Sequence, residues 1–200
     1  MTMNILVAGA TGKTGRQVLQ ALIDQGHKPT ALVRESSDTS DLPHDVDLRN
    51  GDLTDLPSDV CDKMDVVIFA AGSGGATSAE MTDKVDRDGA KKLVDFAARS
   101  GVKRFVMLSS VGADKVNPTG ELAHYLKAKH EADAHLKASG LTYAILRPVA
   151  LTDDARHEDV TLGDDVDTSA TAARADVAYL LAEAATTGRL DGQALNMQSS

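Results

Sequence analysis

Three glycines near the start of the chain have the spacing of a phosphate-binding turn. Gly9, Gly12 and Gly15 stand three residues apart in the run GATGKTG, between an apolar segment at 4–8 and a segment of helical period at 13–25. A diphosphate needs unhindered backbone N–H groups and a helix N-terminus directed at it, and glycine permits the close approach. The pattern predicts a dinucleotide-binding turn. Its expected binding residues are Gly9, Thr11, Gly12, Lys13, Thr14 and Gly15.

A competing motif inside the same turn is excluded by its spacing. Gly12, Lys13 and Thr14 spell the last three residues of a nucleoside-triphosphate phosphate loop. That loop needs a further glycine five residues before the glycine of its GKT, and this chain has Val7 there, inside the apolar segment. The turn is therefore expected to bind a dinucleotide and not a nucleoside triphosphate.

The end of the second predicted strand favours NADP(H) over NAD(H). NAD-binding proteins usually present a carboxylate at this place for the ribose hydroxyls, whereas this chain has Arg34. A guanidinium can bind a 2′-phosphate through two N–H groups. Lys13 and Arg16 add positive charge nearby, and the adjacent Glu35 opposes it. We expect NADP(H), with NAD(H) the less favoured cofactor.

Strand-like and helical segments alternate through residue 147. Strands are predicted at 4–8, 29–34, 46–51, 65–71, 103–108, 141–147 (ended by Pro148) and 194–197, and helices at 13–25, 80–100, 121–139 and 174–187. A short helix is predicted after Leu56, and a flexible loop at 72–77. In the helix at 80–100, the expected inner face is Met81, Val85, Leu93, Phe96 and Ala97. Since parallel strands need crossovers, the alternation predicts an α/β Rossmann fold, a doubly wound parallel sheet with helices on both faces.

The domain organisation predicted from length is simple. Two hundred residues suit a single domain, 1–200, whose last part, 149–200, forms a small C-terminal substrate lobe. The lobe is too short to bury a core alone. Its acidic stretch, 153–167, is expected to be a solvated loop.

Composition narrows the class of protein and its partners. The chain is 42% hydrophobic and 26% charged, which is typical of a globular protein, and one cysteine excludes an internal disulfide. A net charge of −9 disfavours nucleic acid and anionic membranes as partners. The first ten residues lack a signal-peptide pattern, and no apolar run approaches membrane-spanning length. We expect a cytoplasmic monomer or homodimer with a small-molecule substrate and no metal.

Eight short motifs in order resemble the atypical short-chain dehydrogenase/reductase superfamily, and NmrA-like and epimerase-like NAD(P)-binding proteins within it. They are GATGKTG at the start, ALVR at 31–34, GDL at 51–53, FAAG at 69–72, LSSVGAD at 108–114, HYLKAKHEAD at 124–133, LRP at 146–148 and RADVA at 174–178. The resemblance covers nearly the whole chain. Their order is more specific than any single motif.

The resemblance implies roles for further residues. The implied cofactor contacts are Asp52, Leu53, Ala70, Ala71, Gly72, Ser109, Lys129, Pro148 and Val149. Asp52 would accept a hydrogen bond from the adenine amino group, and Ser110 stands where the family's catalytic serine ends the fifth strand. Tyr125 and Lys129 match the family's Tyr-x-x-x-Lys pair. Asp86 stands where many relatives have an asparagine that supports a water relay, which argues against a relay of that kind here.

These residue types suit proton transfer coupled to hydride transfer. Tyr125 and Lys129 are four residues apart, so on a helix they share a face. A phenol with a pKa of about 10 is poorly matched to neutral pH, and a neighbouring ammonium favours the phenolate. The same ammonium could bind the nicotinamide ribose, and the hydroxyl of Ser110 could hold the substrate oxygen.

The predicted function is an NADP(H)-binding oxidoreductase, epimerase-like chemistry included, that acts on a small carbonyl or alcohol substrate. Two alternatives stay open. One is a non-catalytic NADP(H)-binding redox sensor of the NmrA-like type. The other is a flavin or quinone reductase that needs no tyrosine base, because hydride can pass directly to a bound ring.

Overall fold

The computed structural model describes residues 2–72 and 78–199. The strands are β1 (Asn4–Ala8), β2 (Lys28–Val33), β3 (Asp47–Asn50), β4 (Val66–Phe69), β5 (Arg104–Leu108), β6 (Thr142–Pro148), β7 (Ala150–Thr152), β8 (Val160–Leu162), β9 (Thr171–Ala173) and β10 (Gln193–Ser199). The helices are α1 (Lys13–Asp24), α2 (Ala79–Thr82), the π-helical turn η1 (Asp83–Gly89), α3 (Ala90–Arg99), α4 (Ala123–Ala138) and α5 (Arg174–Thr187).

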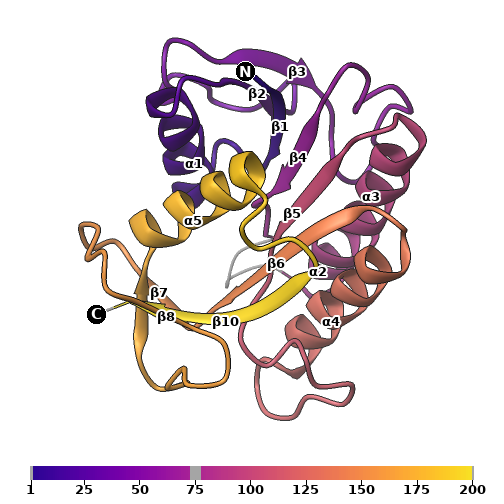
Figure 1. The fold of residues 1–200 in the computed structure, drawn as a ribbon. Helices are drawn as coiled ribbons and strands as arrows, with labels where there is room; N and C mark the ends of the chain where they lie inside the picture. Colours follow the sequence, from indigo (N-terminus) through magenta and orange to yellow (C-terminus); the bar gives the residue numbers. More distant parts are fainter. Residues whose placement is uncertain (1, 73–77, 200) are drawn as a thin grey trace.

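An eight-stranded sheet forms the centre of the molecule (Figure 1). Its strand order is β3-β2-β1-β4-β5-β6-β10-β8, and among these described strands β8 alone runs antiparallel to its neighbour. A separate parallel pair joins β7 and β9. The first six strands have the order of the doubly wound dinucleotide-binding fold, so the predicted fold class is confirmed.

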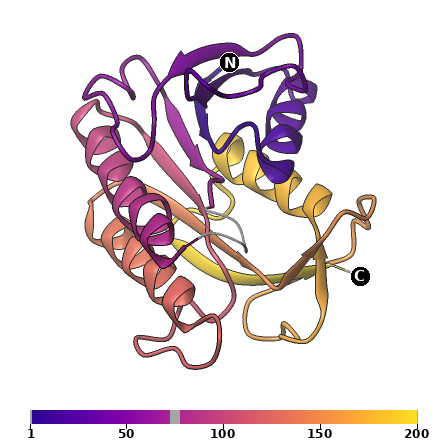
Figure 2. The same ribbon diagram turned by 180° about the vertical axis from the view of Figure 1, so that it is seen from behind.

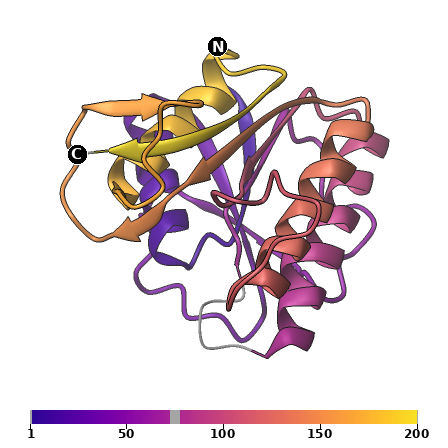
Figure 3. The ribbon, with the colours of Figure 1, turned by 90° about the horizontal axis from the view of Figure 1, so that it is seen from below.

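Helices cover both faces of the sheet. Helices α1 and α5 lie side by side on one face, and the continuous run α2–η1–α3 lies with α4 on the other (Figures 1 and 2). Figure 3 shows the three layers, with the sheet between the two pairs of helices. Two apolar clusters of buried residues fill the two interfaces.

Strand β1 illustrates why the buried residues of the central strands are mainly apolar. Ile5 and Val7 pack into the cluster under α1 and α5, whereas Leu6 and Ala8 pack into the cluster under α3 and α4. A strand covered on both sides has no polar face, so it reads as a continuous apolar run. Helix α1 ends at Asp24, and Gly26 follows it with a φ of 80° and an N–H that donates to the Ile23 carbonyl.

Several predicted elements differ from the observed ones. The helix predicted after Leu56 is wrong, because residues 58–63 form turns. The predicted helix at 80–100 exists but contains the π turn η1, which rotates the residues before it, so that Met81 is 40% exposed instead of buried. Strand β6 ends at Pro148 as predicted, but Pro148 is its last residue and not the residue after it. Strands β7, β8 and β9 were not predicted. Most of the loop predicted at 72–77 lies outside the described residues.

The C-terminal part of the chain is integrated into the fold. Strand β10 pairs in parallel with β6, and α5 packs on α1. The amide of Ala173 donates to the hydroxyl of Ser199, which joins the β9–α5 junction to the chain end. None of the described helices has the length and apolarity needed to cross a membrane.

Candidate functional site

The predicted site residues gather at the carboxyl edge of the parallel strands. Ala8 is in register with Leu32 and Phe69, and Leu108 with Leu146, so these strands end at one level. The residues that follow or form these ends are Gly9–Gly15, Arg34, Asp52, Leu53, Ala70–Gly72, Ser109, Ser110, Pro148 and Val149. After β1 the chain continues into α1 on one face, and after β4 into the α2–η1–α3 run on the other. This reversal is where open α/β sheets bind dinucleotides.

The glycine turn has the close packing that a diphosphate cradle requires. A Cβ atom on Gly9 would lie 2.5 Å from the Ala71 amide nitrogen, and one on Gly15 would lie 2.1 Å from the Gly9 carbonyl oxygen. Gly12 donates its N–H to that same carbonyl at 3.0 Å and is the N-cap of α1, whose first turn has no acidic residue. The exposed N–H groups of such a helix start attract anions. The turn therefore fits the diphosphate of a dinucleotide.

Arg34 and Asp52 are neighbours at the ends of β2 and β3. Arg34 is exposed, and its charge contributes to a lowered pKa of Asp52. The larger cause of that lowered pKa is the backbone N–H of Thr54, which donates to the Asp52 carboxylate at 2.8 Å. The Thr54 hydroxyl donates to the same oxygen at 2.8 Å. The structure thus brings together the two residues assigned to the adenosine half of the cofactor.

Two cations beside the glycine turn form ion pairs with neighbouring segments. Lys13 pairs with Asp153, and Arg16 pairs with Asp41. Asp153 also accepts from Arg174 at the start of α5. Lys13, Arg16, Asp41 and Asp153 line an open cavity of about 540 Å³. Asp153 was expected in a solvated loop. It is exposed, but it connects the C-terminal part of the chain to the glycine turn.

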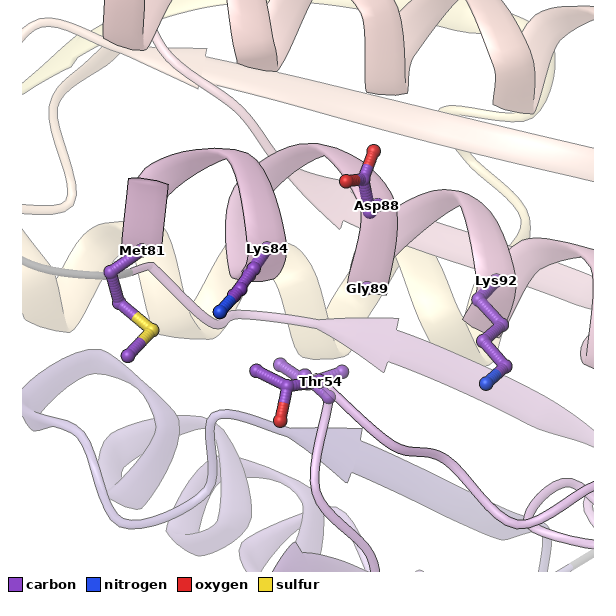
Figure 4. Close-up of a pocket in the computed structure, with 7 residues that line it drawn as sticks. Thr54, Met81, Lys84, Asp88, Gly89 and Lys92 are labelled. Carbon is purple, nitrogen blue, oxygen red and sulfur yellow. The ribbon is translucent and has the colours of Figure 1, made fainter. Parts of the chain in front are cut away.

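A second cavity, of about 380 Å³, lies beside the residues assigned to adenine. It is lined by Leu53, Thr54, Met81, Lys84, Asp88, Gly89 and Lys92. In Figure 4, Lys84 and Lys92 extend from the helix toward the segment that carries Thr54, whereas Asp88 points away. Gly89 brings the helix close to that segment, since a Cβ there would lie 2.7 Å from the Leu53 carbonyl oxygen. The cavity is therefore an extension of the candidate adenine site.

Lys129 is the most completely enclosed residue of the predicted catalytic set. It lies on α4, 2% exposed, and its Nζ is 2.9 Å from the carboxylate of Asp86, which is 0% exposed. Nζ also donates to the Ala71 carbonyl at 3.2 Å and to the Leu108 carbonyl at 3.4 Å. From α4, Lys129 therefore contacts η1 and the residues at the ends of β4 and β5.

Tyr125 and Ser110 lie at more open positions. Tyr125 is in the first turn of α4, half-buried, and its ring centroid is 5.7 Å from Lys129 Nζ. Ser110 follows β5, is partly exposed, and donates its hydroxyl to the Val111 carbonyl at 3.4 Å. The helical spacing correctly predicted that Tyr125 and Lys129 share a face.

A buried ion pair behind Lys129 was not anticipated. Asp133, one turn further along α4, accepts at 2.9 Å from both Nε and Nη2 of Arg147 on β6. Burial raises the pKa of Asp133, and Arg147 and Ser109 act in the opposite direction. The one available signal was the i, i+4 spacing of Lys129 and Asp133, which places two ionisable groups on one inner face.

Comparisons with known proteins agree with this geometry. Residues 9–187 match the family described as NAD(P)H-binding. A protein of Bacillus subtilis described as an uncharacterized sugar epimerase, YhfK, is 36% identical over 158 residues, which are 76% of this chain and 74% of that protein.

Two solved structures are similar over nearly their whole length. A putative NAD-dependent epimerase/dehydratase from Bacillus halodurans has a TM-score of 0.90 and 34% identity, over 99% of this chain and 94% of that chain. The oxidoreductase ylbE from Lactococcus lactis has a TM-score of 0.86 and 30% identity, over 99% and 91%.

Proposed function

The chain belongs to the NAD(P)H-binding family, and from this premise we propose that it is an NADP(H)-dependent oxidoreductase that acts on a small carbonyl or alcohol compound. One observation carries the proposal. The glycine turn follows the carboxyl end of β1, and Ser110 and the helix that bears Tyr125 and Lys129 follow the carboxyl end of β5, the parallel strand on the other side of β4. A cofactor on the turn and a proton donor on α4 would therefore face one crevice. The relatives named oxidoreductase and epimerase/dehydratase support an enzyme.

Each residue has a defined task in this proposal. When bound, the nicotinamide supplies or accepts the hydride. The backbone N–H groups at the start of α1 hold the diphosphate. The hydroxyl of Tyr125 gives a proton to the alkoxide oxygen in reduction and takes one from the alcohol in oxidation. The hydroxyl of Ser110 donates a hydrogen bond to the same substrate oxygen and orients it.

The preference for NADP(H) rests on the cations at the adenosine end. Arg34 is exposed beyond β2, beside Asp52, where a 2′-phosphate would accept from its guanidinium. Lys13 lies on the first turn of α1 and adds positive charge. The remaining lining proposed for the cofactor consists of Thr11, Thr14, Leu53, Ala70, Ala71, Gly72, Ser109, Pro148 and Val149.

A substrate panel followed at the NADPH absorbance band tests the proposal. In Tyr125→Phe, turnover should fall about 100-fold or more, the usual contribution of a general acid–base group. Its affinity for NADPH, measured by calorimetry, should stay within about two-fold of the wild type, since the phenol hydroxyl acts on the substrate. Tyr179→Phe is the matched control, because Tyr179 lies on α5 under the Arg156 guanidinium. No turnover of any carbonyl or alcohol by the wild type would contradict the proposal.

A second candidate activity, direct hydride transfer to a flavin or quinone, is supported by the contacts of Lys129. Its ammonium is paired with Asp86, so its charge is partly neutralised before it acts on Tyr125. A ring acceptor needs no tyrosine base. Quinone or dye reduction that survives in Tyr125→Phe would favour this activity over the first.

A further inference from the structure

The first turn of α4, which carries Tyr125, is only partly anchored by burial. The buried residues of this helix begin at Ala128, one turn later. Leu122, the residue before the helix, provides no side-chain cap and is itself exposed. A helix end without a cap or buried contacts opens readily. The position of the Tyr125 phenol therefore depends on the contacts that this turn makes with other elements.

His124 connects this turn to the segment that follows β4. Its Nε2 lies 2.9 Å from the carboxylate of Asp83 in η1 and 3.2 Å from the carbonyl of Ala79 in α2. Both partners are hydrogen-bond acceptors, so Nε2 carries a hydrogen and donates it. Within residues 2–72 and 78–199, His124 is the residue of this turn whose side chain hydrogen-bonds to another element. The contact joins the start of α4 to α2 and η1, on both of which α4 packs (Figure 1).

The contact can be removed without unfolding the protein. The His124 side chain is 49% exposed and that of Asp83 is 30% exposed, and pairs at such positions contribute little to overall stability. Asp83 also pairs with Arg87 at 3.0 Å, so removal of the imidazole leaves no unpaired carboxylate. Loss of the contact should therefore loosen the first turn of α4 locally and leave the rest of the fold intact.

We propose that His124 is a positioning residue, whose Nε2–H tethers the first turn of α4 to α2 and η1 and thereby sets the place of the Tyr125 hydroxyl. The inference rests on the proposed role of Tyr125 as the proton donor. The two residues are consecutive in one helical turn, so a displacement of the turn moves both. A general acid must lie within hydrogen-bond reach of the substrate oxygen, so a small displacement lowers the rate. His124 itself transfers no proton.

Two substitutions at His124 separate the N–H donor from the imidazole ring. His124→Gln retains an Nε2–H donor, whereas His124→Ala removes it. His135→Ala is the matched control, since His135 lies on the same helix and its Nε2 is 2.7 Å from a carboxylate of another helix, that of Asp95 on α3. The turn of His135 is anchored independently, because the adjacent Leu136 is fully buried.

Amide hydrogen exchange measures the tether without any turnover. The Leu126 N–H donates to the Leu122 carbonyl at 2.9 Å and reports on the first turn of α4. Its exchange, followed by NMR without and with NADPH, should be about three- to five-fold faster in His124→Ala, as expected for the loss of a partly exposed pair, and near the wild-type rate in His124→Gln. The melting temperature of His124→Ala should fall by no more than about 4 °C. His135→Ala should leave the exchange of Leu126 unchanged.

Turnover connects the tether to catalysis. The kcat of His124→Ala should fall about three- to five-fold, while its KM for NADPH stays within about two-fold of the wild type, because the displaced group acts on the substrate and not on the cofactor. His124→Gln should recover most of the lost kcat. His135→Ala should match the wild type in both constants.

Three results would overturn the inference. One is an unchanged exchange rate of the Leu126 N–H in His124→Ala. Another is an equal loss of kcat in His124→Gln and His124→Ala, which would mean that the donor at Nε2 is not what matters. The third is a raised KM for NADPH with an unchanged kcat, which would place His124 at the cofactor site. If the wild type turned over no carbonyl or alcohol, the proposed function would fail instead, and the exchange rates would still decide whether His124 tethers the turn.

Discussion

Gly9→Ala tests the close approach on which the glycine turn depends. The new methyl group would meet the Ala71 amide nitrogen at 2.5 Å and its Cα at 2.6 Å, and both are backbone atoms that cannot rotate away. The positive φ of 80° adds about 1–2 kcal/mol of strain, and the overlap adds about 1–3 kcal/mol. The sum of about 2–5 kcal/mol corresponds to a melting temperature about 10 °C lower for a chain of this size.

Gly26→Ala separates the overlap from the backbone strain. Gly26 has the same φ of 80°, but a Cβ there would have no neighbour within 4 Å among the described residues. Its melting temperature should fall by about 4 °C, from strain alone.

Binding of NADPH is then measured for both variants by calorimetry. Gly9→Ala must displace the turn from the end of β4, so its Kd should rise about ten-fold or more, equivalent to at least about 1.4 kcal/mol. Gly26→Ala should bind like the wild type. Equal effects of the two substitutions, on both stability and binding, would refute the argument that Gly9 is required for close approach.

Three further outcomes are expected. Arg34→Ala should raise the Kd for NADPH about ten-fold and leave the Kd for NADH unchanged, because a charge-assisted hydrogen bond is worth about 1.5–3 kcal/mol. Equal losses of affinity for the two cofactors would exclude a 2′-phosphate contact. Asp153→Asn frees Lys13 from an exposed ion pair, so NADPH should bind up to about three-fold more tightly at low salt, and this gain should vanish at high salt. The pKa of Asp52 is lowered in the folded chain, mainly by the N–H of Thr54, so its stabilisation is present at neutral pH and lost on acidification. Asp52→Asn should therefore flatten the fall in melting temperature between about pH 5 and about pH 3, and an unchanged slope would contradict that assignment.

The order of elements was predictable from local patterns. Strands such as β4 (Val66–Phe69) are apolar throughout because helices cover both faces of a parallel sheet, and this leaves a direct signal in the sequence. Glycines such as Gly26 and Gly101 marked helix ends, because positive φ values there favour glycine. The residues of the glycine turn were likewise predictable, since the turn is a local feature between β1 and α1.

Short strands and helix irregularities were not predictable in this way. Strands β7, β8 and β9 have three residues each, too few for an alternation to appear. The π turn at Asp83–Gly89 inserts a residue into an otherwise regular helical period, and Met81 was assigned to the wrong face for that reason. Both errors arise because periodicity needs several turns of unbroken repeat to be informative.

The sequence by itself determined the doubly wound fold, the glycine turn and the pairing of Tyr125 with Lys129 on one helical face. Only the tertiary structure decided what surrounds Lys129: the ion pair with Asp86, the carbonyls of Ala71 and Leu108, and the Asp133–Arg147 pair behind it. These partners belong to different elements, and their distances depend on strand order and on how α4 packs on the sheet. A local pattern carries no information about such contacts, because they exist only once distant segments have been brought together.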